Sequence, residues 1–95
     1  MSDAARRLPV VVLISGTGSN LRAIAAQAIA GTLPVTIRAV ISDRADSAGL
    51  AWARDAGFAT VALSPRDFPD RPSYDRALAE AVARFEPGLV VLAGF

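Results

Sequence analysis

The chain has 95 residues, of which 53% are hydrophobic and 20% are charged, and its formal net charge at pH 7 is +1. This composition excludes a disordered chain and favours one small folded domain with a single core. It also argues against nucleic-acid binding, because the 10 basic residues are all Arg and are scattered along the chain without forming a basic stripe.

Two residue types with important chemistry are absent, since the sequence contains neither Cys nor His. Without Cys there can be no disulfide and no thiolate metal site, and without His there is no imidazole to act as base, nucleophile or metal ligand. No apolar run approaches the ~20 residues of a membrane span, and the N-terminal stretch lacks the apolar segment of a signal peptide. We therefore expect a soluble, cytoplasmic protein that holds no metal and binds neither membrane nor nucleic acid.

The first predicted elements are a strand at Val10–Ile14 and a helix at Asn20–Ala30. The strand is an unbroken aliphatic run, which is typical of a strand buried on both faces of a parallel sheet. The helix is predicted by apolar residues with the spacing of an amphipathic stripe, namely Leu21, Ile24, Ala25, Ala28 and Ile29. Gly31 follows where a C-terminal cap is expected.

The rest of the chain repeats this alternation of strands and helices. Strands are predicted at residues 35–42, 58–63 and 89–93, and helices at residues 48–56 and 73–85. A proline-rich loop at residues 64–72 is the only long connector. The order β-α-β-α-β-α-β predicts an α/β domain with a parallel sheet and helices on both faces, in which the last strand is buried like the first.

The turn between the first strand and the first helix reads Ser15-Gly16-Thr17-Gly18-Ser19-Asn20. Gly16 and Gly18 permit positive φ and let an anion approach the backbone without meeting a Cβ. The N–H groups that follow lie in the unsatisfied first turn of the helix, where the helix dipole favours a negative group. Ser19 or Asn20 can cap the helix or donate to a phosphate oxygen. A plain capped turn is the simpler alternative, but the combination of strand, Gly-x-Gly and Ser-Asn favours phosphate binding.

The same turn departs from both common nucleotide-binding motifs. The dinucleotide fingerprint Gly-x-Gly-x-x-Gly needs a third glycine where this chain has Leu21. Asp43, the candidate for the ribose-binding acid, lies somewhat beyond the usual ~20 residues. A P-loop needs a Lys after the glycines, and the sequence has none. By elimination, the turn is predicted to bind a single phosphate monoester.

Residues 11–21, VVLISGTGSNL, closely resemble the N-terminal motif of the phosphoribosylglycinamide formyltransferase family. The likeness continues through AVISDRAD at residues 39–46, the helix start Gly49-Leu50, Tyr74-Asp75 and VVLAGF at residues 90–95. It covers nearly the whole chain from Val10 onward, and the pairing of SGTGSN with VVLAGF is specific. Methionyl-tRNA formyltransferases share the general fold but have a first loop of a different kind.

The resemblance implies a Rossmann-like formyltransferase fold and a reaction in de novo purine (IMP) biosynthesis. In that reaction a formyl group passes from the co-substrate 10-formyltetrahydrofolate to the amine of glycinamide ribonucleotide. The resemblance further implies that Gly18, Ser19 and Asn20 hold the ribose phosphate and that Arg71, in the proline-rich loop, contacts the folate. The family's catalytic Asn, His and Asp would all follow Phe95, so no catalytic residue is expected within this chain.

We therefore expect residues 1–9 to form an N-terminal tail and residues 10–95 to form the phosphate-binding half of a formyltransferase domain, with the catalytic half beyond this chain. A last strand without an outer neighbour would be an exposed apolar edge, which favours the same interpretation. A stand-alone phosphate- or nucleotide-binding module without catalysis is the alternative. The sequence leaves open whether the protein is a homodimer.

Overall fold

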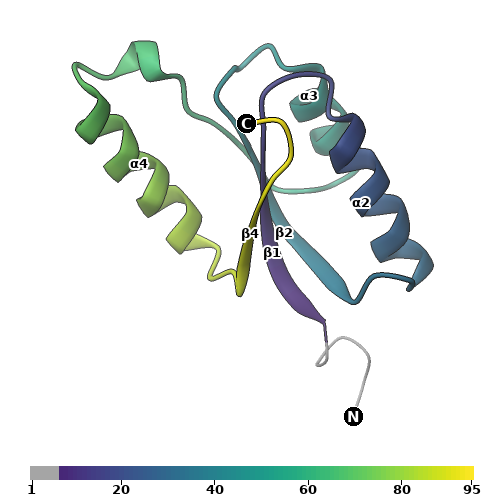
Figure 1. Cartoon of the computed structure of the whole chain (residues 1–95). Helices are drawn as coiled ribbons and strands as arrows, with labels where there is room; N and C mark the ends of the chain where they lie inside the picture. The colour runs from purple at the N-terminus through teal and green to yellow at the C-terminus, as the bar shows by residue number, and fades with distance from the viewer. Residues whose placement is uncertain (1–6) are drawn as a thin grey trace.

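The computed structural model describes residues 7–95, which form one sheet flanked by helices (Figure 1). The strands are β1 (Leu8–Ile14), β2 (Val35–Ser42), β3 (Thr60–Ala62) and β4 (Leu89–Leu92). They are hydrogen-bonded in the order β3-β2-β1-β4, and every neighbouring pair is parallel. The predicted Rossmann-like α/β fold with a parallel sheet is confirmed.

The strand order determines where a ligand-binding crevice can form. The chain moves from β1 outward to β2 and β3, then crosses back so that β4 pairs with the free side of β1. This is the beginning of the strand order of the dinucleotide-binding fold, whose ligands lie outside the carboxyl ends of the strands where the order reverses. The reversal lies between β1 and β4, and the chain leaves β1 at this point through residues 15–20, here called the glycine turn.

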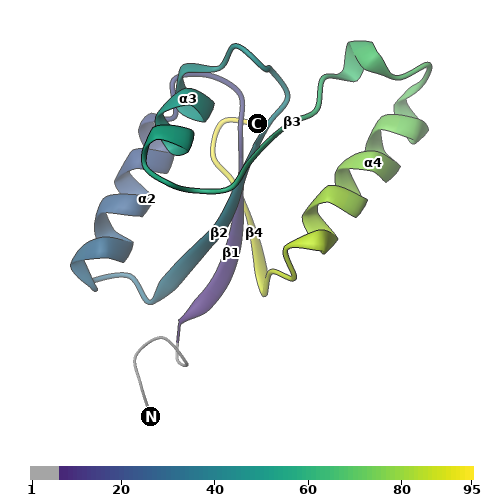
Figure 2. The same ribbon diagram turned by 180° about the vertical axis from the view of Figure 1, so that it is seen from behind.

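Helices lie on both faces of the sheet, as predicted. They are α2 (Ser19–Ala30), α3 (Ala48–Asp55) and α4 (Arg71–Arg84), with a short 3-10 helix, η1 (Pro65–Asp67), before α4. Figures 1 and 2 show α2 and α3 on one face and α4 on the other. The guanidinium of Arg22 in α2 lies 5.6 Å from the centroid of the Trp52 ring in α3, which joins the two helices on their shared face.

β1 divides the core into two clusters, because successive side chains of a strand point to opposite faces. On one face, Val10, Val12 and Ile14 pack with apolar residues of α2 and α3. On the other face, Val11 and Leu13 pack with residues of α4. All of these β1 side chains are at most 5% exposed. The prediction of a first strand buried on both faces is therefore confirmed.

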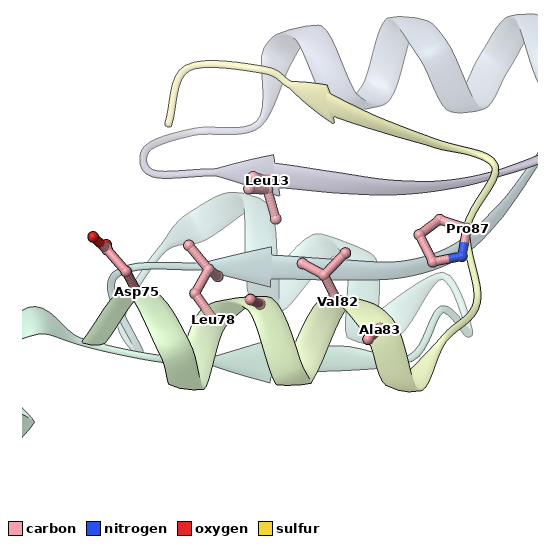
Figure 3. A pocket seen from close by; sticks show the side chains of 7 residues that line it. Leu13, Asp75, Leu78, Val82, Ala83 and Pro87 are labelled. Atoms are coloured by element: carbon pink, nitrogen blue, oxygen red, sulfur yellow. The ribbon is translucent and has the colours of Figure 1, made fainter. Parts of the chain in front are cut away.

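β4 was predicted to be equally buried, and that prediction is wrong. Leu89, Val90 and Leu92 are 49%, 39% and 69% exposed, because β4 lies at the edge of the sheet and has β1 as its only neighbour among residues 7–95. Beside this edge lies an open apolar groove of about 500 Å³, lined by Leu13 of β1 and by Leu78 of α4 among others (Figure 3). An aliphatic run does not distinguish a central strand from an edge strand, so the pairing order decided the exposure.

The N-terminal half differs from prediction in two places. β1 begins at Leu8 instead of Val10, inside the predicted tail, while residues 1–6 of that tail lie outside the described residues. Ile29, predicted on the buried stripe of α2, is 80% exposed. It lies at the rim of the stripe, and only the middle of the stripe faces the sheet.

The segment predicted as a proline-rich loop is partly helical. Residues 65–67 form η1, and α4 begins at Arg71 instead of Ser73. The Oδ1 atom of Asp70 accepts a hydrogen bond from the Ser73 N–H at 2.8 Å and so caps α4. Pro72 then lies in the first turn, where its missing N–H costs no hydrogen bond.

Tyr74 connects α4 to the segment that follows β3. Its side chain is buried, its hydroxyl donates to the carbonyl oxygen of Leu63 at 3.1 Å, and its ring meets that of Phe68 edge-on with the centroids 5.6 Å apart. Burial raises the pKa of the Tyr74 hydroxyl above its ordinary value, and the charge of Asp43 adds to the rise.

The deprotonation of the Tyr74 hydroxyl can be followed without interference from other side chains. Tyr74 is the only Tyr, and the sequence has no Cys and no Lys, so no other side chain titrates between about pH 9 and pH 12. We expect the ultraviolet absorbance of the phenolate to appear with a midpoint above the ordinary pKa of Tyr. The contribution of Tyr74 to the free energy of unfolding should stay constant up to that ordinary pKa and fall above it, because the unfolded chain releases its proton first.

The variant Tyr74→Phe is the control for this titration, because it removes both the absorbance change and the loss of stability at high pH. Around the hydroxyl, Asp43 and Asp75 raise its pKa and Arg71 lowers it, but burial is the largest cause. Added salt should therefore move the midpoint only slightly. A midpoint at or below the ordinary Tyr pKa would contradict the burial of this hydroxyl.

Candidate functional site

The glycine turn lies at the carboxyl edge of the sheet, where the strand order reverses. Gly18 is the N-cap residue of α2 and has a φ of +78°, in the left-handed region that L side chains rarely adopt. A Cβ on Gly18 would lie 2.7 Å from the Cα of Gly49 in α3, which is too close for two carbon atoms. Position 18 therefore needs glycine both for its conformation and for the space beside it.

Gly16 differs from Gly18 in both respects. Its φ is not positive, and a Cβ there would meet no atom within 4 Å. Of the two glycines that permit a positive φ, only Gly18 therefore adopts one. Instead Gly16 contributes its carbonyl oxygen, which accepts hydrogen bonds from the Ser47 hydroxyl at 2.8 Å and from the Gly49 N–H at 3.1 Å.

The start of α2 has no side-chain cap, unlike the other helices of residues 7–95. A side chain caps each of the others: Ser47 in α3, Ser64 in η1 and Asp70 in α4. Gly18 has no side chain to offer to α2. Of the two roles considered for Ser19 or Asn20, capping this helix is wrong, because both residues already lie inside it.

The first turn of α2 consequently keeps free backbone donors. The Arg22 N–H donates to the carbonyl oxygen of Gly18 at 2.9 Å, whereas the N–H groups of Ser19, Asn20 and Leu21 find no acceptor among the described residues. Ser19 and Asn20 are exposed, so their hydroxyl and amide donors can reach the same ligand. Together with the helix dipole, this arrangement suits an anion.

Arg71 lies in the first turn of α4, on the opposite face of the sheet, and not in a loop as predicted. Its Nε is 3.1 Å from the Oδ1 of Asp75, and its guanidinium lies 5.3 Å from the centroid of the Tyr74 ring. The side chain is 68% exposed, so its other N–H groups remain available. Figures 1 and 2 show the start of α4 at the same edge of the sheet as the glycine turn. The fold thus brings the two predicted binding elements to one edge, on opposite faces.

A polar hollow of about 710 Å³ lies between the β2–α3 loop and the segment after β3, lined by Asp43, Arg44, Asp46, Ser64 and Arg66 among others. The Oδ1 atom of Asp43 is buried there and has no hydrogen-bond partner among the described residues. The structure therefore places Asp43 in a hollow to which the glycine turn adds no lining residue.

Residues 7–95 lack two other features that could indicate a function. No cluster of three or more acidic side chains in this range could hold a metal ion. None of its helices combines the length and the apolar character needed to cross a membrane.

The start of α3 is a part of the site that the sequence patterns did not reveal. Ser47 is recognisable as an N-cap residue because it precedes a helical stretch. No local pattern, however, indicates that Ser47 and Gly49 contact the glycine turn. The parallel pairing of β1 with β2 brings the two helix starts together.

The sequence of this chain is similar to one family model and to several proteins of known name. The sequence model of the family described as Formyl transferase matches residues 8–95. The phosphoribosylglycinamide formyltransferase of Escherichia coli (strain K12) is 48% identical over 86 residues, which cover 90% of this chain and 41% of that protein. The trifunctional purine biosynthetic protein adenosine-3 of Homo sapiens is 37% identical over 90 residues, which cover 95% of this chain and 9% of that protein.

Solved structures show the same similarity. The phosphoribosylglycinamide formyltransferase of Coxiella burnetii matches with a TM-score of 0.88 at 46% identity, over 94% of this chain and 42% of that one. The protein of the same name from Brucella melitensis matches with a TM-score of 0.89 at 39% identity, over 94% of this chain and 46% of that one. This chain therefore spans less than half the length of the bacterial proteins to which it is similar.

The two glycines of the turn should respond differently to an added methyl group. Gly18→Ala forces an L side chain into positive φ and against the backbone of Gly49, so we expect the free energy of unfolding to fall by about 2 kcal/mol or more. Gly16→Ala is the matched control and should change it by about 0.5 kcal/mol or less. Denaturant unfolding of both variants measures the difference, and equal losses would contradict the described geometry of the turn.

Proposed function

Because this chain belongs to the formyl transferase family, whose sequence model matches residues 8–95, we propose that it supplies the substrate-phosphate site of a phosphoribosylglycinamide formyltransferase. The reaction is the transfer of a formyl group from 10-formyltetrahydrofolate to the amine of glycinamide ribonucleotide, in de novo purine (IMP) biosynthesis. The names of the relatives support this activity. We place the reaction in the cytoplasm and take both substrates to be small molecules.

The observation that carries the proposal is the uncapped start of α2. In this proposal, the N–H groups of Ser19 and Asn20 hold the phosphate of the ribonucleotide, and Gly18, which is buried against Gly49, fixes the start of the helix beside it. The donors are already arranged by the fold, so binding the phosphate orders little further chain. Holding the phosphate at the switch point would present the amine at the other end of the substrate in one orientation.

The chemical step needs groups that this chain does not supply. The amine nitrogen attacks the formyl carbon and a tetrahedral oxyanion forms. The oxyanion then collapses, the carbon–nitrogen bond to the folate breaks, the amine loses a proton and the leaving folate nitrogen gains one. The chain has no His, and Asn20 is its only Asn. We therefore propose that residues 10–95 are the phosphate-binding half of the domain and that the catalytic groups lie in the rest of the protein.

Arg71 is the proposed contact to the folate. Asp75 and the Tyr74 ring hold the guanidinium from one side, and the exposed N–H groups remain available for a carboxylate or for stacking on a flat ring. The location of α4 supports this role, because its start lies at the same edge of the sheet as the glycine turn. A folate bound there would face the ribonucleotide across the ends of β1 and β4.

Removal of the phosphate from the substrate tests the central claim. In the full-length protein, we expect glycinamide riboside to show a KM at least about tenfold higher than glycinamide ribonucleotide, because charge-assisted hydrogen bonds are lost. Mass spectrometry of the formylated product measures the rates. Equal KM values would reject the phosphate site, and tight binding of the ribonucleotide without any formylated product would favour a binding module without catalysis.

The role of Arg71 predicts a separate effect on the second substrate. Arg71→Ala in the full-length protein should raise the KM for 10-formyltetrahydrofolate about tenfold and leave the KM for glycinamide ribonucleotide unchanged. Arg76→Ala is the matched control, since Arg76 is an exposed Arg on the same helix. An effect confined to glycinamide ribonucleotide would reject the assignment.

A further inference from the structure

Ser47 connects the start of α3 to the glycine turn across 31 positions of sequence. Its hydroxyl donates to the carbonyl oxygen of Gly16 at 2.8 Å and accepts from the N–H of Leu50 at 3.2 Å. A serine hydroxyl has one proton to donate, and here it goes to the turn, while a lone pair caps α3. Ser47 is 5% exposed, so water competes little for either bond.

Gly49 adds a second attachment at the same place. Its N–H donates to the same carbonyl oxygen of Gly16 at 3.1 Å. A Cβ on Gly49 would lie 2.8 Å from the Cα of Gly18 and 2.7 Å from the Cδ1 of Ile14, so the two backbones are in direct contact. The start of α3 therefore contacts the glycine turn through two hydrogen bonds and one close approach between the two backbones.

These contacts determine which backbone groups of the turn can meet a ligand. A carbonyl oxygen that turned toward a bound anion would repel it. Ser47 and Gly49 hold the carbonyl of Gly16 toward α3, so its oxygen does not face the bound anion. Because a trans peptide is planar, fixing this carbonyl also directs the N–H of Thr17 away from α3.

We propose that Ser47 is a positioning residue for the substrate phosphate, acting through its hydrogen bond to the Gly16 carbonyl and without touching the ligand. This inference rests on the proposed phosphate site of the glycine turn. The hydroxyl keeps the turn in the conformation that presents its N–H donors, so the turn has less conformational freedom to lose when phosphate binds. Ser47 then contributes to the affinity for the phosphorylated substrate and not to the chemical step.

The test separates this role from simple capping of α3. Ser47→Gly removes the hydroxyl donor but costs a helix start little, because glycine is also accepted at the N-cap position. In the full-length protein, we expect Ser47→Gly to raise the KM for glycinamide ribonucleotide about fivefold at unchanged kcat. The KM for glycinamide riboside, which has no phosphate, should stay at its wild-type value. Ser47→Thr keeps the hydroxyl and should restore the wild-type KM.

A matched variant controls for loss of a cap elsewhere. Asp70→Ala removes the side-chain cap of α4 and should lower stability without changing the KM for glycinamide ribonucleotide. If Ser47→Gly behaved like Asp70→Ala, with lower stability but an unchanged preference for the phosphorylated substrate, the positioning role would be overturned. If the wild-type protein itself showed no such preference, the proposed phosphate site would fail first, and the inference with it.

Discussion

The backbone contact between Gly18 and Gly49 is the constraint on which the site depends. No Cβ fits at either position, since one on Gly18 would lie 2.7 Å from the Cα of Gly49. The starts of α2 and α3 can therefore lie against each other at the carboxyl edge of the sheet. The same bare residue that permits this packing also leaves α2 without a side-chain cap. Packing thus requires glycine at position 18, and the proposed phosphate site depends on the missing cap that results.

The first two residues of this uncapped helix, Ser19 and Asn20, lie at the surface, whereas Leu21 is buried. Backbone donors without a partner are costly only where water cannot reach them, and Ser19 and Asn20 are exposed. The other helices of residues 7–95 begin with side-chain caps, which leave fewer donors for a ligand. The strand order is the second feature that favours a ligand site here. The uncapped start of α2 follows β1 at the point where the strand order reverses.

Residue patterns predicted the elements well where one local rule governed them. The aliphatic run at Val10–Ile14 has no polar face, so it had to be a strand covered on both sides. Patterns were less reliable where neighbours decided the outcome. β4 has an equally aliphatic sequence but is exposed, because it pairs on one side only. Arg71 was assigned to a loop because prolines suggested one, whereas the Asp70 cap and Pro72 together begin α4 there.

The sequence by itself determined the alternation of strands and helices and the place of the glycine turn between β1 and α2, and it predicts that this turn binds a phosphate monoester. These properties depend on residues close together in the chain. Only the tertiary structure decided that α2 has no side-chain cap, that Arg71 lies across the sheet from the turn, and that Ser47 and Gly49 hold the carbonyl of Gly16. For the contacts of Ser47 and Gly49, the physical reason is that they join residues about 30 positions apart, which meet only after β1 and β2 have paired. The place of Arg71 likewise depends on where the chain packs α4 against the sheet, which no local pattern specifies.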